Sequence, residues 1–393
     1  MIDVTFLIST YNRGHVLLET LAHLNRCGLP ASRYEIIVVD NASTDSAADL
    51  VAHWFREVKL IRLSENRGPC AKNDGLKIAR GKYVVFLDDD SFPQPGAVLG
   101  MLRKFEMQPS LGAAVFTVTL PSGQQECSAY PNVFIGCGTG FRREALDEVG
   151  GLPDDFFMQA EEYDLSLRLM NAGWRVERFD DLHVTHLKTP RSRYPERVMK
   201  LDVRNNILLA FRHFPLKMAV SLAVDWTKRY RMIAKVNGRQ TAFWAGVAAG
   251  IWAVLRDGKR ARIAPEAVEQ FTRNTEIETK IRRWAIENKI TRVLFVDLGK
   301  NSLAYHVAAK KVGLHVVGIA DENLGGHGLR YRGVEILKDD AAMTPGFDGV
   351  VISNTSPVHA RSRLAEWSQR VGGKVMDVLR DEAVVENVVR LAA

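Results

Sequence analysis

The sequence predicts an α/β protein with a Rossmann-like, mostly parallel sheet first, then a helical appendage, then a small Rossmann-like α/β domain. Apolar, β-rich runs alternate with helical patterns from Val4 onward; this alternation stops after His186 and resumes at Thr291. The chain has 393 residues, more than the roughly 250 to 300 that one hydrophobic core supports. We therefore expect three parts, at residues 1–190, 191–285 and 286–393.

The strands of both sheets are predicted by short, nearly continuous apolar runs. Strands of parallel βαβ units are buried on both faces, so their polar residues gather at their ends, and ligands bind beyond the carboxyl ends. The first sheet should contain Val4–Ser9, Glu35–Asp40, Val58–Leu63 and Tyr83–Asp88, and the second Arg292–Asp297, His315–Ile319 and Gly349–Ile352. All four strands of the first sheet end in polar residues, which predicts a binding edge there.

Charge is concentrated in the middle of the chain. The net charge is +7, yet residues 190–285 alone hold 20 Lys and Arg against 8 Asp and Glu, a difference of +12. The longest uncharged run there, Gln240–Leu255, has 16 residues, fewer than the about 20 that span a bilayer. The four cysteines are scattered without metal-ligand spacing, and the N-terminus lacks the pattern of a signal peptide. These features predict a cytoplasmic protein.

Three adjacent carboxylates, Asp88, Asp89 and Asp90, end the fourth strand. Like charges at this density repel one another unless a cation shares them. Oxygen ligands suit Mg²⁺ or Mn²⁺, which bind protein carboxylates together with phosphate oxygens of a substrate. The alternative is a solvated, Asp-rich turn. Asp40 ends the second strand in the same way, while Ser43 and Asp45 are better explained as caps of the next helix.

Several ordered motifs in the first 190 residues resemble family-2 glycosyltransferases, and among them bacterial rhamnosyltransferase-like members. The motifs are Ile8–Arg13, Val38–Asp45, Glu65–Gly68 with Lys72 and Asn73, Phe86–Asp90, Gly140–Arg143 with Val149–Leu152, and Glu161–Arg168. The resemblance implies a GT-A fold and transfer of a hexosyl or deoxyhexosyl group from a nucleotide sugar. The acceptor would be a hydroxyl of a glycan or lipid-linked molecule in cell-surface polysaccharide synthesis.

The resemblance also assigns expected roles to residues of this chain. Asp40 would contact the nucleobase and Lys72 the diphosphate, and Asp90 and Asp88 would bind Mn²⁺ or Mg²⁺ in a DXD element. His186 is expected as a further metal ligand and His183 as its reserve, although a lone histidine is more often structural. We expect Val184 on one face of its strand and both histidines off it. The whole expected donor set is Thr10, Tyr11, Arg13, Asp40, Asn66, Lys72, Asp88 and Asp89.

A second carboxylate cluster supplies the expected catalytic base. Family members usually have Asp at the second position of this element, where this chain has Glu162, so both Glu162 and Glu161 remain candidates. Without the resemblance, Glu162 is equally well explained as an N-terminal helix carboxylate. Asp164 and Arg168 are four residues apart and should pair on one helix face. One base and no second nucleophile predict a single displacement with inversion.

The basic segment 191–285 combines Lys, Arg and Trp in helical patterns, which suits peripheral contact with the inner face of the cytoplasmic membrane. An ordinary helical packing layer is the alternative. No motif indicates nucleic-acid binding.

In the C-terminal domain, Asp297–Ser302 holds only one glycine of a dinucleotide fingerprint. This part resembles nucleotide-sugar or coenzyme-A-binding-like modules of sugar-modifying enzymes, which implies a regulatory or assembly role. For the chain as a whole, two other functions remain as alternatives: a non-catalytic GT-A-like scaffold or sugar-binding protein, and a sugar nucleotidyltransferase.

Overall fold

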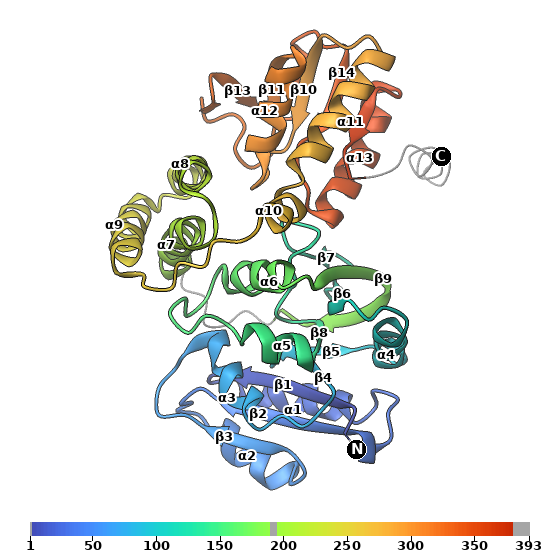
Figure 1. Ribbon diagram of the computed structural model, residues 1–393, viewed down its shortest axis with the longest axis vertical. Coiled ribbons are helices and arrows are strands. Elements are labelled where there is room, and N and C mark those ends of the chain that lie inside the picture. The colour runs from blue at the N-terminus through green and yellow to red at the C-terminus, as the bar shows by residue number, and fades with distance from the viewer. Residues whose placement is uncertain (1, 189–194, 380–393) are drawn as a thin grey trace. The chain divides into compact units, whose positions relative to one another are not determined.

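The structure is a computed structural model that describes residues 2–188 and 195–379 (Figure 1). Two compact units divide these residues. Unit 1 comprises the described residues of 1–127 and 132–205, and unit 2 those of 128–131 and 206–393. The finer division into three parts stays a prediction.

Unit 1 is built on a nine-stranded sheet with the order β3-β2-β1-β4-β8-β6-β9-β5, and β7 pairs with β6. Its parallel half lies where the sequence predicts strands: β1 (Val4–Thr10), β2 (Tyr34–Asp40), β3 (Lys59–Arg62) and β4 (Tyr83–Asp88). Its mixed half contains β5 (Ser91–Pro93), β6 (Leu111–Thr119), β7 (Gln125–Glu126), β8 (Thr139–Arg142) and β9 (Arg175–His186). The predicted α/β class with a parallel-rich first sheet is confirmed, and the mixed half adds strands that the sequence analysis does not predict.

Helices cover both faces of this sheet, which is why its central strands are apolar throughout. In β1, Phe6 and Ile8 join one buried cluster with α1, while Leu7 joins the opposite cluster with α6. The helices are α1 (Gly14–Leu24), α2 (Ala47–Trp54), α3 (Lys72–Leu76), α4 (Ala97–Met107), α5 (Arg143–Val149) and α6 (Glu161–Asn171). The predicted pair of Asp164 and Arg168 forms on α6, with Nε and Oδ1 2.7 Å apart.

Unit 2 combines helices with a second Rossmann-like sheet. Its sheet has the order β12-β13-β11-β10-β14-β15 and is parallel except for the β12–β13 pair. The strands are β10 (Arg292–Val296), β11 (His315–Ala320), β12 (Arg330–Tyr331), β13 (Val334–Leu337), β14 (Gly349–Ile352) and β15 (Val375–Asp377). The helices are α7 (Pro195–His213, shared with unit 1), α8 (Leu216–Val236), α9 (Gln240–Arg256), α10 (Pro265–Thr272), α11 (Asn274–Glu287), α12 (Ser302–Val312) and α13 (Pro357–Val371).

None of the helices in the described part of the chain combines the length and the apolar character needed to cross a membrane.

A buried carboxylate, Glu35, fastens the start of β2 to its neighbours. Glu35 accepts hydrogen bonds from the Thr5 hydroxyl at 2.8 Å, from Lys59 Nζ at 2.8 Å, and from the backbone N–H and Nε of Arg80 at 2.6 and 3.0 Å. Burial alone would raise its pKa, but the bonds from Lys59, Arg80 and Thr5 together outweigh burial and lower the pKa of Glu35 to about 2.

We expect Glu35→Gln to lower the free energy of unfolding by about 1 to 3 kcal/mol at neutral pH, because it removes the charge that four hydrogen bonds stabilise. A depressed folded-state pKa stabilises the protein above the unfolded value of about 4.3, and this contribution is lost as pH falls toward 2. The difference between wild type and variant should therefore shrink in acid, as measured by urea unfolding. Asp49→Asn, in an exposed pair with Arg62, is the control and should change stability little. Equal effects of the two substitutions would contradict this account.

Candidate active site

The carboxyl ends of β1, β2 and β4 meet at one edge of the unit 1 sheet. In the parallel register Thr10 lies opposite Asp40, and Ser9 lies opposite Asp88. Lys72, at the start of α3, reaches this edge and places Nζ 3.4 Å from Asp88 Oδ1. The edge thus brings together most of the side chains that the sequence predicts for donor binding.

The three adjacent aspartates have different surroundings. The side chain of Asp88 is 34% exposed, whereas Asp89 and Asp90 are buried. Asp89 accepts a hydrogen bond from the Thr10 hydroxyl at 2.8 Å, and Arg13 bridges Asp89 and Asp90 at 3.2 and 2.5 Å. Burial raises the pKa of Asp89 to about 7, although Arg13 opposes this shift. The contacts among Thr10, Arg13 and Asp89 therefore stabilise the interior of the site. Asp88 remains at the solvent-exposed edge.

Other predicted donor residues hold the loops of this edge. The Asp40 carboxylate accepts the backbone N–H of Ser43 at 3.2 Å, and Asn66 Oδ1 accepts that of Gly68 at 2.8 Å. Tyr11 is half-buried in the loop after β1. These contacts keep Asp40 and Asn66 at the edge.

Asp88, Cys137 and His186 form a group able to ligate a metal ion. One ligand atom of each lies within 4.8 Å of the other two. His186 Nδ1 lies 2.6 Å from Glu126 Oε2, while Nε2 is 3.3 Å from Asp90 Oδ1. A carboxylate on one ring nitrogen is the usual means of orienting the other toward a metal. The carboxylate, imidazole and thiol donors therefore fit a divalent ion.

His186 is the positively charged member of this group. Burial alone lowers its pKa, but hydrogen bonds to Asp90, Cys137 and Glu126 outweigh burial and raise the pKa of His186 to about 12. His183, the reserve candidate, is exposed. The expectation that both histidines leave the face of Val184 is wrong: His186 is buried like Val184, because residues two apart on a strand share a face.

Cys137 was not predicted from the sequence as a metal ligand. It lies between two glycines and has no neighbouring cysteine or histidine, so its spacing gives no metal signal. The sequence shows only that this cysteine lies between Gly136 and Gly138.

The two candidate bases at the start of α6 face different surroundings. Glu162 is half-buried, and its Oε1 accepts the backbone N–H of Gly136 at 2.8 Å. Glu161 is buried, and burial together with repulsion by Glu162 raises its pKa well above the ordinary value. Gly136 directly precedes Cys137, so the Glu162 carboxylate and the metal-ligand group involve two adjacent residues of the chain.

Asn205 of α7 holds the loop before α6 and is a second residue that sequence reasoning missed as a site residue. Its side chain is fully buried, and Nδ2 lies 3.0, 2.8 and 2.7 Å from the carbonyl oxygens of Phe156, Met158 and Gln159. Phe157, Gln159 and Ala160 have φ values of 62°, 71° and 66°, a conformation that non-glycine residues seldom adopt. Asn205 thus stabilises the strained approach to Glu161 and Glu162.

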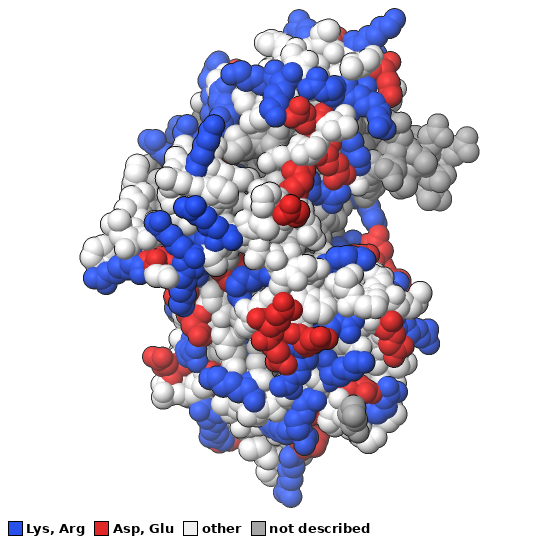
Figure 2. All heavy atoms as spheres, in the orientation of Figure 1, with Lys and Arg blue, Asp and Glu red and all other residues white. Residues whose placement is uncertain are grey.

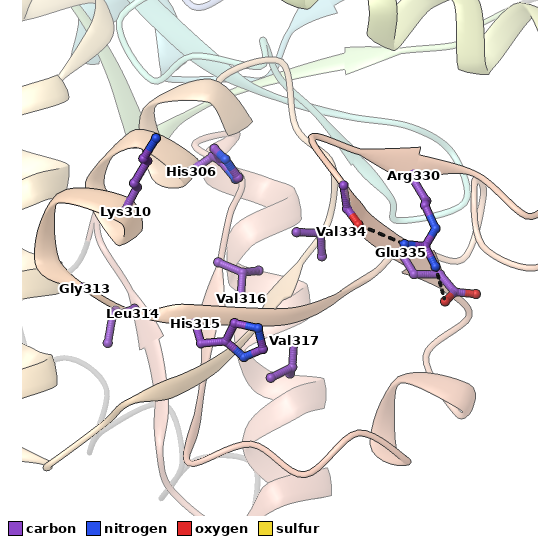
Figure 3. A pocket seen from close by; sticks show the side chains of 11 residues that line it. His306, Lys310, Gly313, Leu314, His315, Val316, Val317, Arg330, Val334 and Glu335 are labelled. Atoms are coloured by element: carbon purple, nitrogen blue, oxygen red, sulfur yellow. Dashed lines mark hydrogen bonds and ion pairs between the residues drawn. The ribbon is translucent and has the colours of Figure 1, made fainter.

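The corresponding edge of the unit 2 sheet is occupied by its own side chains. Arg363 bonds Asp339 through both terminal nitrogens, at 2.5 and 2.7 Å, and Asp297 through Nε at 2.9 Å. A hollow of about 690 Å³ lies instead near the amino end of β11, beside His306, Lys310 and Arg330 (Figure 3). Parallel sheets bind cofactors at the opposite ends of their strands.

Comparison with known proteins agrees with this geometry. A crystal structure of S. aureus TarS 1–349 in complex with UDP-GlcNAc superposes with a TM-score of 0.50 at 14% identity, covering 85% of this chain and 100% of that chain. At this identity the likeness concerns the fold alone. A parallel half joined to a mixed half, with an acidic strand end between them, is the GT-A fold.

Two family models of glycosyltransferases match this chain. Residues 5–131 match the family model "Glycosyl transferase family 2", and residues 120–285 match "Glycosyl transferase family group 2". Poly-beta-1,6-N-acetyl-D-glucosamine synthase of Staphylococcus aureus (strain COL) is 28% identical over 199 residues, 44% of this chain and 47% of the relative. The Staphylococcus epidermidis protein of that name is 26% identical over 201 residues, 45% and 46% respectively. The chain spans about half the length of these relatives.

Asn205→Asp should destabilise unit 1 more than Asn205→Ala, because a carboxylate of the same shape faces three carbonyl oxygens without a donor. We expect Asn205→Ala to lower the free energy of unfolding by about 1 to 3 kcal/mol. Both variants should also speed proteolysis within residues 154–160. Asn237→Ala, which removes an amide bonded to one carbonyl at an exposed helix end, is the matched control. Proteolysis of that loop at the wild-type rate would contradict the role given to Asn205.

Proposed function

We propose that this chain is an inverting glycosyltransferase. It moves a hexosyl or deoxyhexosyl group from a nucleoside-diphosphate sugar to a hydroxyl of a glycan or lipid-linked acceptor in cell-surface polysaccharide synthesis. The observation that carries the proposal is that Glu162 accepts a hydrogen bond from the backbone of Gly136, and the next residue, Cys137, belongs to the group of Asp88, Cys137 and His186. Such proximity suits a reaction in which one carboxylate activates the acceptor while the leaving diphosphate is neutralised nearby.

Glu162 is the proposed base. Glu162 is half-buried, and its Oε1 accepts a backbone hydrogen bond from Gly136, which orients the carboxylate for general-base catalysis. Glu161 is less suited, because its raised pKa favours the protonated form, which accepts no proton. Proton removal by Glu162 and attack of the hydroxyl on the anomeric carbon, opposite the leaving diphosphate, give inversion.

Asp88, Cys137 and His186 would hold a divalent ion, with Asp90 beside Nε2 of His186. We propose Mn²⁺ over Mg²⁺. Imidazole and thiol donors suit an ion softer than Mg²⁺, which prefers sites made of oxygen ligands alone. The bound ion would act as a Lewis acid on the diphosphate oxygens. Lys72, next to Asp88, adds a second positive charge for the same diphosphate.

The donor to test first is UDP-GlcNAc. It is bound by the S. aureus TarS structure that shares the fold, and the curated relatives are named as synthases of an N-acetylglucosamine polymer. In the proposal the nucleobase lies near Tyr11 and Asp40. A place on the inner face of the cytoplasmic membrane, through residues 191–285, would bring the site to a lipid-linked acceptor.

Donor hydrolysis separates this proposal from its alternatives. A glycosyltransferase should release the nucleoside diphosphate slowly from its donor with Mn²⁺ and not with chelator. A scaffold or sugar-binding protein would bind without turnover, and a nucleotidyltransferase would release pyrophosphate from a sugar phosphate and a nucleoside triphosphate.

Glu162→Gln preserves the shape of the side chain and its bond to Gly136 but removes the proton acceptor. Sugar transfer should fall by about two to four orders of magnitude, while donor affinity stays near that of the wild type. The measurements are transfer kinetics and calorimetric donor binding. Glu161→Gln is the matched variant and should retain most transfer. If Glu161→Gln loses transfer and Glu162→Gln does not, the base is one residue earlier; a product that retains the donor configuration would rule out the mechanism.

Cobalt(II) gives a test of the ligand group that needs no turnover. A thiolate bound to Co²⁺ produces an intense near-ultraviolet charge-transfer band, so the wild type should show this band on titration. Cys137→Ser should abolish the band while weaker Co²⁺ binding remains, and His186→Ala should weaken binding itself. Cys27→Ser, at a buried cysteine in the segment after α1, is the control and should keep the band. Persistence of the band in Cys137→Ser would remove Cys137 from the ligand set.

A further inference from the structure

Helix α9 of unit 2 is apolar on its outward face. Trp244, Ile251, Trp252 and Leu255 are 53%, 54%, 55% and 75% exposed. Trp244, Ala248, Ile251 and Leu255 follow one another at helical spacing, so they form a continuous stripe. The opposite side, with Phe243, Gly246 and Gly250, is buried. A helix with apolar side chains all round is normally covered on every side, and this one is covered on one side only.

The neighbouring helix α8 also exposes apolar side chains. Leu216, Val220 and Val224 lie four residues apart and are 61%, 45% and 46% exposed. Farther along α8 the exposed positions become basic, at Lys228, Arg231 and Lys235. Exposed apolar positions on two helices exceed the scattered single residues that a protein surface normally carries. We name the outward residues of α8 and α9 the α8–α9 face.

The charges around this face have one sign. From Trp226 to Arg256 the chain contains six Lys and Arg and no Asp or Glu. The carboxylates that flank this stretch are buried in ion pairs: Asp225 with Arg332 and Asp257 with Arg212, each at 2.9 Å. Figure 2 shows uncharged side chains over α9 at the left margin of the molecule, with basic side chains beside them. The face is therefore apolar with a basic border.

Cations and tryptophans are adjacent on the border. The guanidinium of Arg231 lies 5.6 Å from the ring of Trp244, and that of Arg256 lies 3.8 Å from the ring of Trp252. Long basic side chains that keep their charge at the edge of apolar surface, next to tryptophan, suit the boundary between headgroups and acyl chains. Lys259, Arg260 and Arg262 follow α9 and add positive charge.

We propose that the α8–α9 face lies in the surface of an anionic lipid bilayer, with α9 parallel to the membrane plane. Trp244, Ile251, Trp252 and Leu255 enter the acyl boundary, and the basic border contacts the headgroups. A second copy of the chain fits less well, because a two-fold interface would bring two borders of like charge together. The binding does not depend on the proposed reaction, since it requires neither donor nor metal.

The test is co-sedimentation of the full chain with vesicles of phosphatidylcholine and phosphatidylglycerol in equal amounts, against vesicles of phosphatidylcholine alone. Binding should occur to the anionic vesicles, weaken with added salt, and shift tryptophan emission to the blue. The double variant Ile251→Ser, Leu255→Ser should lower the partition coefficient roughly tenfold or more, because it removes two apolar side chains from the contact. Ile286→Ser, at an isoleucine on α11 that is 71% exposed, is the matched control and should bind like the wild type.

A charge variant separates the two contributions. Lys235→Gln with Arg256→Gln should reduce binding to anionic vesicles and leave the salt-independent part unchanged. Light scattering after gel filtration measures the molar mass and so shows whether a second copy of the chain covers the face instead. Absence of binding to anionic vesicles, or a dimer in the wild type that Ile251→Ser, Leu255→Ser dissolves, would overturn the proposal. Metal-dependent donor hydrolysis, measured without vesicles, keeps failure of the membrane proposal distinct from failure of the proposed function.

Discussion

The site in unit 1 depends on the burial of two neighbouring carboxylates, Asp89 and Asp90, at the end of β4. Two carboxylates buried side by side repel each other when both are ionised, and this repulsion destabilises the fold unless cations lie close by. Arg13, from the loop after β1, bridges both, and His186, from the end of β9, adds a second cation beside Asp90. The need to balance these two carboxylates thus links the loop after β1, in the parallel half, to the end of β9, in the mixed half. Asp88 is left at the open edge.

The parallel half of unit 1 could be predicted from sequence because its determinants are local. Each strand is buried on both faces, so Val4–Thr10 and Tyr83–Asp88 are visible as apolar runs, and the chemistry-bearing residues follow at their ends. Asp88 and His186 of the ligand group were expected from the family resemblance, but Cys137 could not be predicted. Cys137 and His186 are 49 positions apart in the sequence and meet only because β8 and β9 both pair with β6. No spacing rule expresses that register.

The different surroundings of Glu161 and Glu162 depend on a feature that the sequence does not reveal. Successive helical residues point about 100° apart, so one of two adjacent glutamates faces the interior when the other faces the edge. The helical pattern of α6 was visible in the sequence, but its rotation about its own axis was not. That rotation depends on the loop 156–160, which Asn205 holds from α7, 45 to 49 positions later in the chain.

The α8–α9 face also governs the colloidal behaviour of the isolated protein. Exposed apolar side chains attract one another between copies, while the basic border keeps the copies apart. At an ionic strength of 0.1 M that repulsion acts over about 10 Å, and at 1 M over about 3 Å. Salt therefore removes the barrier to association while leaving the attraction in place. We therefore expect the chain to associate less in buffers of low ionic strength than in concentrated salt.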